Sequence, residues 1–203
     1  MPQQGPAAIN PGLSSEDFLV TRLIARLRVR AEADRLWHVR DSAPRTALFE
    51  QGDPCDAVFV LVSGLVKLSY RTAGGDAWIK SFIVDHGLFG AELGEAGGDT
   101  VRYAASCVEP VQHVRLPRHW VAAVVGDDPD LLRGFADFSA WVLRRKQARE
   151  EMLLCLSAED RYRLLLAQEP ALAARLMQAD IARYIGITPI ALSRIRRRIG
   201  PAS

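Results

Sequence analysis

The sequence contains few cysteines, few histidines and no long apolar run, and each shortage excludes a class of protein. The three cysteines, Cys55, Cys107 and Cys155, are odd in number and scattered, which argues against a disulfide framework and fits a reducing compartment. The four histidines contain no HxH or HExxH spacing, and no pair of cysteines has the spacing of metal ligands. We therefore expect no metal site, no bound cofactor and no metal-dependent enzyme.

Long apolar segments are also missing. Ala57–Val62 is among the longest apolar runs, far below the roughly 20 residues that a membrane helix needs. The N-terminal residues MPQQGPAAINPG lack the basic and apolar regions of a signal peptide, and we expect residues 1–14 to form a disordered tail. An apolar content of 49% and a charged content of 25% are ordinary for a soluble globular protein. These features predict a cytoplasmic protein without a membrane partner.

The segment Gln178–Arg197 has the pattern of a helix-turn-helix. Its apolar positions recur at helical spacing, and Ala182 is small where two helices would cross closely. Gly186 suits the positive φ at which a chain leaves a helix, Thr188 can cap a second helix, and Pro189 suits that helix's first position. The apolar positions are Ile181, Ile185, Ile187, Leu192 and Ile195.

Charge is concentrated in the same segment. From Gln178 onward there are five arginines and one acid, Asp180, which gives a net charge of +4. The whole chain carries +2, so the residues before Gln178 carry −2. Positive charge on a helix-turn-helix predicts double-stranded DNA as the partner. The alternative is a helical hairpin whose arginines form an ordinary solvated face.

The region from Pro44 to about Pro117 predicts a β domain. Short runs rich in valine, phenylalanine and tyrosine alternate with glycine turns such as Ser63-Gly64. The glycines of Asp85–Leu93 indicate a loop. A spacing of about ten residues per strand predicts a compact sandwich or barrel. The predicted strands are Val58–Val62, Leu65–Tyr70, Trp78–Val84, Val101–Ser106 and Val111–Leu116.

Helical patterns flank the β region, from Ser15 to about Leu36 before it and over Arg118–Val125 and Asp130–Leu156 after it. The last of these spaces its apolar residues by four, three and four positions, as in a coiled-coil seam. A second copy of the chain is the simplest partner for such a seam, which predicts a homodimer. The alternative is packing on the chain's own β domain. The seam residues are Leu131, Phe135, Phe138 and Val142.

A further helix is expected between the seam and the helix-turn-helix. Ser157-Ala-Glu-Asp160 is a capping sequence, the helix continues through Gln168, and Pro170 stops it.

In this order, the motifs resemble those of the Crp/Fnr family of bacterial transcription regulators. Phe49-Glu-Gln-Gly-Asp53 is similar to the family's turn before the third strand, and Phe59–Leu68 to its most recognisable β-hairpin. Phe89-Gly90 with Glu92-Leu93 resembles the start of its phosphate cassette. The closing strands, with Leu116-Pro117-Arg118, and the helix-turn-helix complete a resemblance over about residues 15 to 200.

The resemblance implies an α+β protein that acts as a dimer at promoters. Residues 15–127 would form a cyclic nucleotide-binding-like β-roll, a double-stranded β-helix that senses an effector. Residues 128–156 would form the dimerisation helix, and residues 157–203 an all-α DNA-binding domain. A hinge around Leu154 to Ser157 would set the angle of the two recognition helices. RNA polymerase is a candidate further partner at such a promoter.

The effector site departs from the family pattern. In cyclic nucleotide-binding members the cassette glutamate takes the ribose hydroxyl, and an arginine pairs with the cyclic phosphate. Here Ala91 interrupts the cassette, and the arginine position falls within Gly97-Gly98-Asp99, which offers a phosphate no positive charge. The long helix carries KQAREE where the cyclic AMP receptor offers Thr or Ser to the base. We therefore expect that cyclic AMP is not bound in the usual mode. The effector-pocket candidates are Gly90, Glu92, Leu93 and Arg102.

The recognition helix departs as well. Family members often carry a glutamate where this chain has Ile190, which can contact a thymine methyl but cannot hydrogen-bond a base. Arg194 is the expected reader of guanine O6 and N7. No winged hairpin follows Ile199 in this sequence, which predicts weaker binding with a shallower salt dependence. The DNA-binding candidates are Arg183, Thr188, Pro189, Ile190, Ser193, Arg194, Arg196, Arg197 and Arg198.

The sequence thus predicts a dimeric, sequence-specific DNA-binding regulator that reads a near-palindromic promoter site. One alternative is a ligand-binding module that acts through protein contacts and carries a degenerate helix-turn-helix. A second is a cupin-like enzyme, because cupins are also β-rolls; the missing His-rich metal site argues against it.

Overall fold

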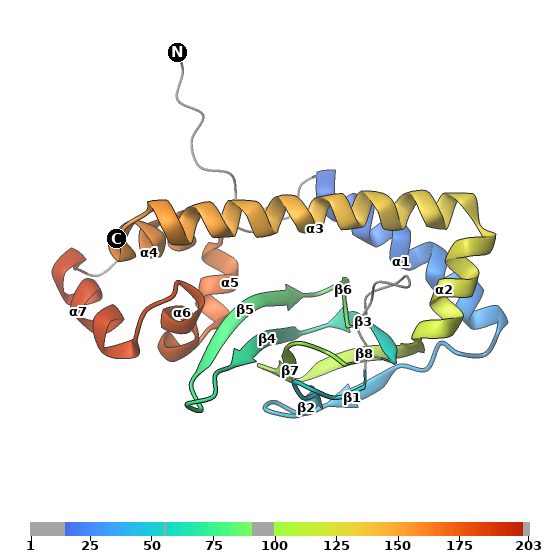
Figure 1. Cartoon of the computed structure of the whole chain (residues 1–203), viewed down its shortest axis with the longest axis horizontal. Coiled ribbons are helices and arrows are strands. Elements are labelled where there is room, and N and C mark those ends of the chain that lie inside the picture. Colours follow the sequence, from blue (N-terminus) through green and yellow to red (C-terminus); the bar gives the residue numbers. More distant parts are fainter. Residues whose placement is uncertain (1–14, 55, 91–99, 201–203) are drawn as a thin grey trace, which may run out of the picture. The chain divides into compact units, whose positions relative to one another are not determined.

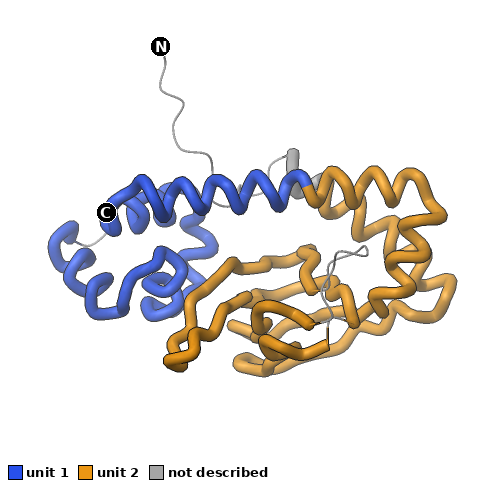
Figure 2. The backbone as a smooth tube through the Cα atoms, viewed as in Figure 1, with its two compact units in different colours: residues 1–14, 140–203 blue, residues 15–139 orange. Residues whose placement is uncertain are grey.

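The computed structural model describes residues 15–54, 56–90 and 100–200 (Figure 1). They form two compact units, one of residues 15–139 and one of the described residues from 140 onward (Figure 2). The boundary falls inside the long helix α3, Pro129–Cys155. The sequence-based boundary after residue 156 follows the end of a helix, whereas the compact units follow contacts, which group the second half of α3 with the C-terminal helices.

The first unit is built on two antiparallel sheets of four strands each. One sheet has the order β1-β8-β3-β6 and the other β2-β7-β4-β5. The strands are β1 Arg40–Ser42, β2 Ala47–Phe49, β3 Ala57–Ser63, β4 Leu65–Arg71, β5 Ala77–Val84, β6 Gly87–Gly90, β7 Ala104–Cys107 and β8 Val111–Pro117. Gly64 joins β3 to β4 with φ +102°, and a Cβ there would lie 2.6 Å from the carbonyl oxygen of Pro110. Only glycine therefore fits this turn without moving the backbone.

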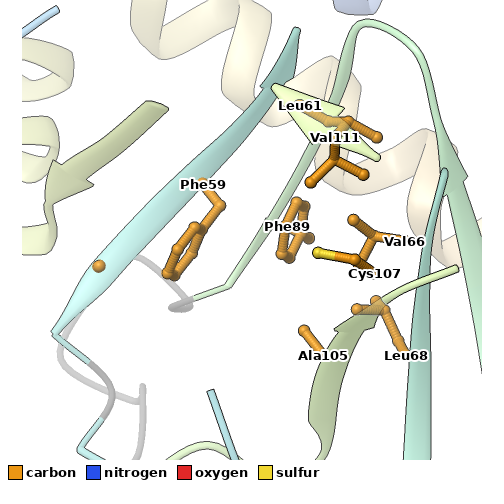
Figure 3. Packing of buried hydrophobic residues seen from close by; sticks show 9 residues of the cluster. Phe59, Leu61, Val66, Leu68, Phe89, Ala105, Cys107 and Val111 are labelled. Atoms are coloured by element: carbon orange, nitrogen blue, oxygen red, sulfur yellow. The ribbon is translucent and has the colours of Figure 1, made fainter. Parts of the chain in front are cut away.

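The core of the β domain lies between the two sheets. Side chains from β3 and β6 point toward those of β4 and β7 (Figure 3). Period-two alternation places Ala57, Phe59 and Leu61 on this inner side, while Val58 and Val60 are buried on the opposite face of β3.

Three helices complete the first unit: α1 Ser15–Ala33, α2 Arg118–Asp127 and the first half of α3. Helix α1 contacts β6, and α2 contacts β3 and β8. The Oδ1 atom of Asp128 accepts from the backbone N–H groups of Asp130 and Leu131, at 2.9 and 3.2 Å, and so caps the start of α3. These hydrogen bonds hold the pKa of Asp128 below its usual value.

The second unit contains the second half of α3 and the helices α4 Ala158–Gln168, α5 Pro170–Arg175, α6 Gln178–Tyr184 and α7 Pro189–Ile199. The predicted caps are confirmed, because Ser157 Oγ accepts from the Asp160 N–H and Thr188 Oγ1 accepts from the Ala191 N–H, each at 3.2 Å. Gly186 has φ +75°, as expected for the turn between α6 and α7. The helix-turn-helix core contains Tyr162, Leu165, Leu172, Ile181, Ala182, Ile185, Leu192 and Ile195.

Two local predictions in the β domain were wrong. The expected loop Asp85–Leu93 contains the strand β6, because Phe89 pairs with Phe59 of β3 and stacks on its ring with centroids 5.2 Å apart. The strand that was predicted over Val101–Ser106 begins at Ala104, because Arg102 and Tyr103 form a bend. In the first case the glycine content of the segment was outweighed by pairing with a distant strand.

Candidate nucleic-acid interface and effector pocket

Helix α7 separates its residues into a buried and an exposed face. Leu192 and Ile195 are buried against the other helices of the unit, with Leu192 only 1% exposed. The opposite face is open to solvent, and Ile190 at its start is 67% exposed. Every DNA-binding candidate proposed from the sequence lies in an exposed position: Arg183, Thr188, Pro189, Ile190, Ser193, Arg194, Arg196, Arg197 and Arg198.

The arginines of α7 have different surroundings. Arg198 pairs with Glu159 of α4, and the same carboxylate pairs with Arg163 at 2.6 Å. Arg196 and Arg197 line a cavity of about 400 Å³, together with Tyr162, Leu166 and Ile199. Within the described part of the chain, no acidic side chain pairs with Arg194. Arg194 is therefore the α7 arginine that neither pairs with a carboxylate nor lines this cavity.

Two arginines from other helices donate hydrogen bonds to backbone carbonyl groups at the start of the turn between α6 and α7. Arg149 of α3 donates from Nη2 to the carbonyl oxygen of Tyr184 at 2.7 Å, and its guanidinium lies 4.3 Å from the centroid of the Tyr184 ring. Arg161 of α4 donates to the carbonyl oxygen of Ile185 at 2.7 Å. Burial raises the pKa of Tyr184, and the positive charges of Arg149 and Arg145 oppose that rise. The sequence alone does not single out these arginines, since each lies far along the chain from the residue that it contacts.

In the β domain, aromatic rings occupy the space between the sheets. Phe49 lies 5.5 Å from Phe59, 6.2 Å from Phe89 and 5.6 Å from Tyr103, measured between ring centroids. The hydroxyl of Tyr103 accepts from the Gly90 N–H at 3.2 Å and donates to the Gly90 carbonyl oxygen at 3.0 Å. Tyr103 therefore occupies the backbone donor of the predicted cassette residue Gly90.

The described residues form a small cavity beside this cluster. A cavity of about 190 Å³ is lined by Phe49, Phe59, Val101 and Arg115 among others. This is below the roughly 300–1,000 Å³ of typical ligand sites. Arg115 Nη2 pairs with Asp56 Oδ2 at 2.6 Å, so the positive charge of this cavity-lining arginine is already paired with a carboxylate of the chain.

Two of the four effector-pocket candidates, Gly90 and Arg102, lie among the described residues. Gly90 lies at the end of β6 and is engaged by Tyr103. Arg102 is exposed in the bend before β7 and does not line the 190 Å³ cavity. Glu92 and Leu93 lie outside the described residues. Tyr103 lies inside the predicted strand Val101–Ser106, and no local pattern indicates that its hydroxyl would contact Gly90.

Two further groups of the β domain are buried and titratable. His113 of β8 is 6% exposed and lies 3.1 Å, through Nε2, from Ser42 Oγ. Burial lowers the pKa of His113, and the nearby charge of Arg40 lowers it further. Burial also raises the pKa of the Cys107 thiol, which is 1% exposed, so the thiolate is disfavoured.

The predicted seam on α3 faces its own chain at its start. Leu131 is 0% exposed within the single chain, so it is not available to a second copy. Phe135, Phe138 and Val142 are half-buried. The large apolar residues of α3 that are exposed are instead Leu132 (54%), Leu143 (57%) and Leu154 (76%).

The described residues form neither a cluster of metal ligands nor a membrane-spanning helix. In residues 15–54, 56–90 and 100–200, no group of three or more His, Cys, Asp or Glu side chains could hold a metal ion. None of the described helices combines the length and apolar character needed to cross a membrane.

Comparison with known proteins gives a consistent result. Residues 39–128 match the family of cyclic nucleotide-binding domains. The nitrogen fixation regulation protein FixK of Azorhizobium caulinodans is 27% identical over 164 residues, which span 75% of this chain and 64% of that relative. The chain therefore matches a little under two thirds of that relative's length.

Solved structures agree on the fold. FixK2 of Bradyrhizobium japonicum has a TM-score of 0.71 at 20% identity, over 80% of this chain and 83% of that chain. The c-di-GMP-responsive regulator CLP of Xanthomonas campestris has a TM-score of 0.69 at 17% identity, over 88% of this chain and 90% of that one. The predicted combination of a β-roll with C-terminal helices is thereby confirmed.

Proposed function

The chain carries a cyclic nucleotide-binding domain and is a homologue of Crp/Fnr-type regulators, and on that premise we propose that it is a dimeric, sequence-specific DNA-binding transcription regulator. The single observation that carries the proposal is α7. Its apolar side is buried in a capped helix-turn-helix, and its other side exposes polar and basic residues in the positions from which a recognition helix reads a major groove.

In this proposal, some of the exposed residues contact bases and the others contact phosphates. Arg194 would donate two hydrogen bonds to guanine O6 and N7, and Ile190 would contact a thymine methyl. Pro189 starts the helix beside Ile190. The remaining candidates would contact phosphates and set the register of the helix on the duplex. These are Arg183, Thr188, Ser193, Arg196, Arg197 and Arg198.

We place the homodimer contact on the exposed leucines of α3 and not on the seam that begins at Leu131. Leu132, Leu143 and Leu154 follow one another at intervals of 11 residues, which is close to three helical turns, so they share one face. A second copy would bury this face. The dimer would present two α7 helices to half-sites about 34 Å apart, one turn of the duplex, on a near-palindrome.

We propose that the β domain does not bind cyclic AMP in the usual mode, on three observations of its described residues. The Tyr103 hydroxyl is hydrogen-bonded to the backbone of Gly90. The neighbouring cavity of about 190 Å³ is small, and its Arg115 is paired with Asp56. We propose that any small effector acts on this domain without that mode. Such an effector would work through its different affinities for two arrangements of the dimer. We also propose that the protein works in the cytoplasm, with RNA polymerase as a candidate partner and without enzymatic activity.

Sequencing of sheared host genomic DNA captured by the purified protein tests the proposal. We expect enrichment of a short near-palindrome, with the same sites recovered when cyclic AMP or cyclic GMP is added. Sites recovered only with a nucleotide would contradict the proposal for the β domain. The absence of any enriched sequence would contradict DNA reading.

A protein-contact module is the second candidate. It is favoured by Ile190, since a branched apolar side chain that is 67% exposed suits a protein contact as well as a thymine methyl. This candidate predicts no selective DNA binding at moderate salt, so the same experiment separates the two.

A further inference from the structure

Two arginines outside the helix-turn-helix hold the end of α6, just before the turn that leads to α7. Arg149 of α3 donates to the carbonyl oxygen of Tyr184, the last residue of α6. Arg161 of α4 donates to the carbonyl oxygen of Ile185 at 2.7 Å and to that of Leu156 at 3.2 Å. The Arg161 side chain thus joins the α3–α4 junction to the α6–α7 turn.

The chemistry of this contact favours a stiff connection. The last carbonyl groups of a helix have no partner within the helix, and they carry its negative partial charge. A guanidinium supplies both the hydrogen-bond donor and the positive charge that these carbonyl groups lack. Its planar shape also allows Arg149 to stack on the buried Tyr184 ring while it donates. The two contacts are made by charged groups and are therefore stronger than neutral hydrogen bonds.

The turn itself is packed tightly against the same two helices. A Cβ added at Gly186 would lie 3.1 Å from Leu153 Cδ2 of α3 and 3.2 Å from Arg161 Nη1 of α4. The turn between α6 and α7 contains only residues 185–188. A movement of the turn relative to α3 would therefore break the arginine contacts and disturb this packing.

We propose that Arg149 and Arg161 are positioning residues that join the second half of α3, α4 and the recognition helix α7 into one rigid body. This rests on the proposed DNA-binding function. The junction around Leu154 to Ser157, which the family resemblance predicts to be a hinge, is then rigid. The direction of α3 sets the direction of α7, and through it the half-site spacing that the dimer accepts.

The experiment measures binding of the full-length protein to operators that share one half-site sequence but differ in spacing. The wild-type protein should prefer one spacing by about tenfold or more over a spacing changed by half a turn, because the second α7 then misses its groove. Arg149→Met and Arg161→Met should each reduce this preference to below about threefold, while selectivity within the half-site is retained. Arg144→Met is the matched control, since Arg144 lies exposed on the same helix and carries the same charge.

Amide hydrogen exchange provides a reading that does not depend on DNA. The N–H groups of Ile185 and Ile187 donate to the carbonyl oxygens of Ile181 and Ala182, both at 3.0 Å, so they report on the turn. Their exchange should quicken in Arg149→Met and remain at the wild-type rate in Arg144→Met. If Arg149→Met does not fold, Arg149→Lys, which keeps the charge but loses the planar stacking group, takes its place.

The outcomes are distinct. An unchanged spacing preference in both arginine variants, or loss of half-site selectivity together with spacing preference, overturns the positioning role. Unchanged exchange at Ile185 and Ile187 also overturns it. If the wild-type protein binds no operator selectively, the proposed function fails, and the exchange rates alone decide whether the junction is locked.

Discussion

The candidate residues of the helix-turn-helix face solvent, whereas the aromatic residues around the predicted effector site of the β-roll face the interior of their own domain. On α7 the candidate residues point outward, and even the apolar Ile190 is exposed. In the β domain the residues around the predicted effector site point inward, and Phe49, Phe59, Phe89 and Tyr103 contact one another there. One region offers a surface to a partner, and the other satisfies its own groups.

Among the described residues, this difference indicates which of the two parts keeps polar groups available to an external partner. An exposed guanidinium such as that of Arg194 remains free for a new hydrogen bond, at the cost of displacing water. A donor such as the Gly90 N–H is already hydrogen-bonded by Tyr103, so a ligand would have to break that contact first. The comparison therefore favours DNA over a nucleotide effector as the partner.

The largest expected effect comes from Phe59→Ala in the β-roll. Removing a ring that is 5% exposed and stacks on Phe89 leaves a cavity, which should lower the free energy of unfolding by about 3–5 kcal/mol. Urea unfolding followed by circular dichroism measures it. Tyr70→Ala, at a ring that is 44% exposed on β4, should cost much less. Equal losses in the two variants would contradict the inward packing of Phe59.

Arg194→Ala should have the next largest effect, on DNA and not on stability. Loss of a bidentate contact to guanine costs about 1–3 kcal/mol of discrimination against other bases. Competition binding on the enriched site and on single-base variants measures it. Arg144→Ala removes the same charge away from α7 and should leave base preference intact. A wild-type preference pattern in Arg194→Ala would remove Arg194 as the base reader.

Tyr103→Phe tests the hydrogen bonds between the Tyr103 hydroxyl and Gly90, and a smaller effect is expected. Without the hydroxyl, the N–H and carbonyl groups of Gly90 lose this partner, which should lower the free energy of unfolding by about 1 kcal/mol. Tyr70→Phe is the matched control at an exposed tyrosine. A variant as stable as the wild type would indicate that the Tyr103 hydroxyl makes no net contribution in solution.

The smallest effect concerns pH. Because the pKa of His113 is lowered in the folded chain, the unfolded chain takes up its proton first as the pH falls below about 6.5. His113 therefore favours the folded state fully above that pH, and this contribution is lost as the pH falls further. Unfolding measured from pH 7.5 to 5 should show a shallower decline in His113→Gln than in the wild type. His119→Gln, at an exposed histidine, should follow the wild-type slope; identical slopes in all three proteins would exclude His113 as a source of the decline.

Local patterns predicted the helix-turn-helix well. Thr188 and Ser157 cap the helices for which they were expected, and Gly186 adopts the positive φ assigned to it. These features depend on neighbours a few residues away, so their physical cause is contained in a short segment. The strand β6 was missed because its partner, β3, begins 30 positions earlier than Gly87, at Ala57.

The sequence by itself determined the helices, the longer strands, the basic face of α7 and the caps and turn of the helix-turn-helix, because these depend on periodicity and short-range hydrogen bonds. Only the tertiary structure decided that Leu131 is buried in its own chain, that Tyr103 binds Gly90, and that Arg149 and Arg161 hold the end of α6. Each of these contacts joins residues that are distant in sequence, and its energy exists only once the packed chain has excluded water and brought the two groups together.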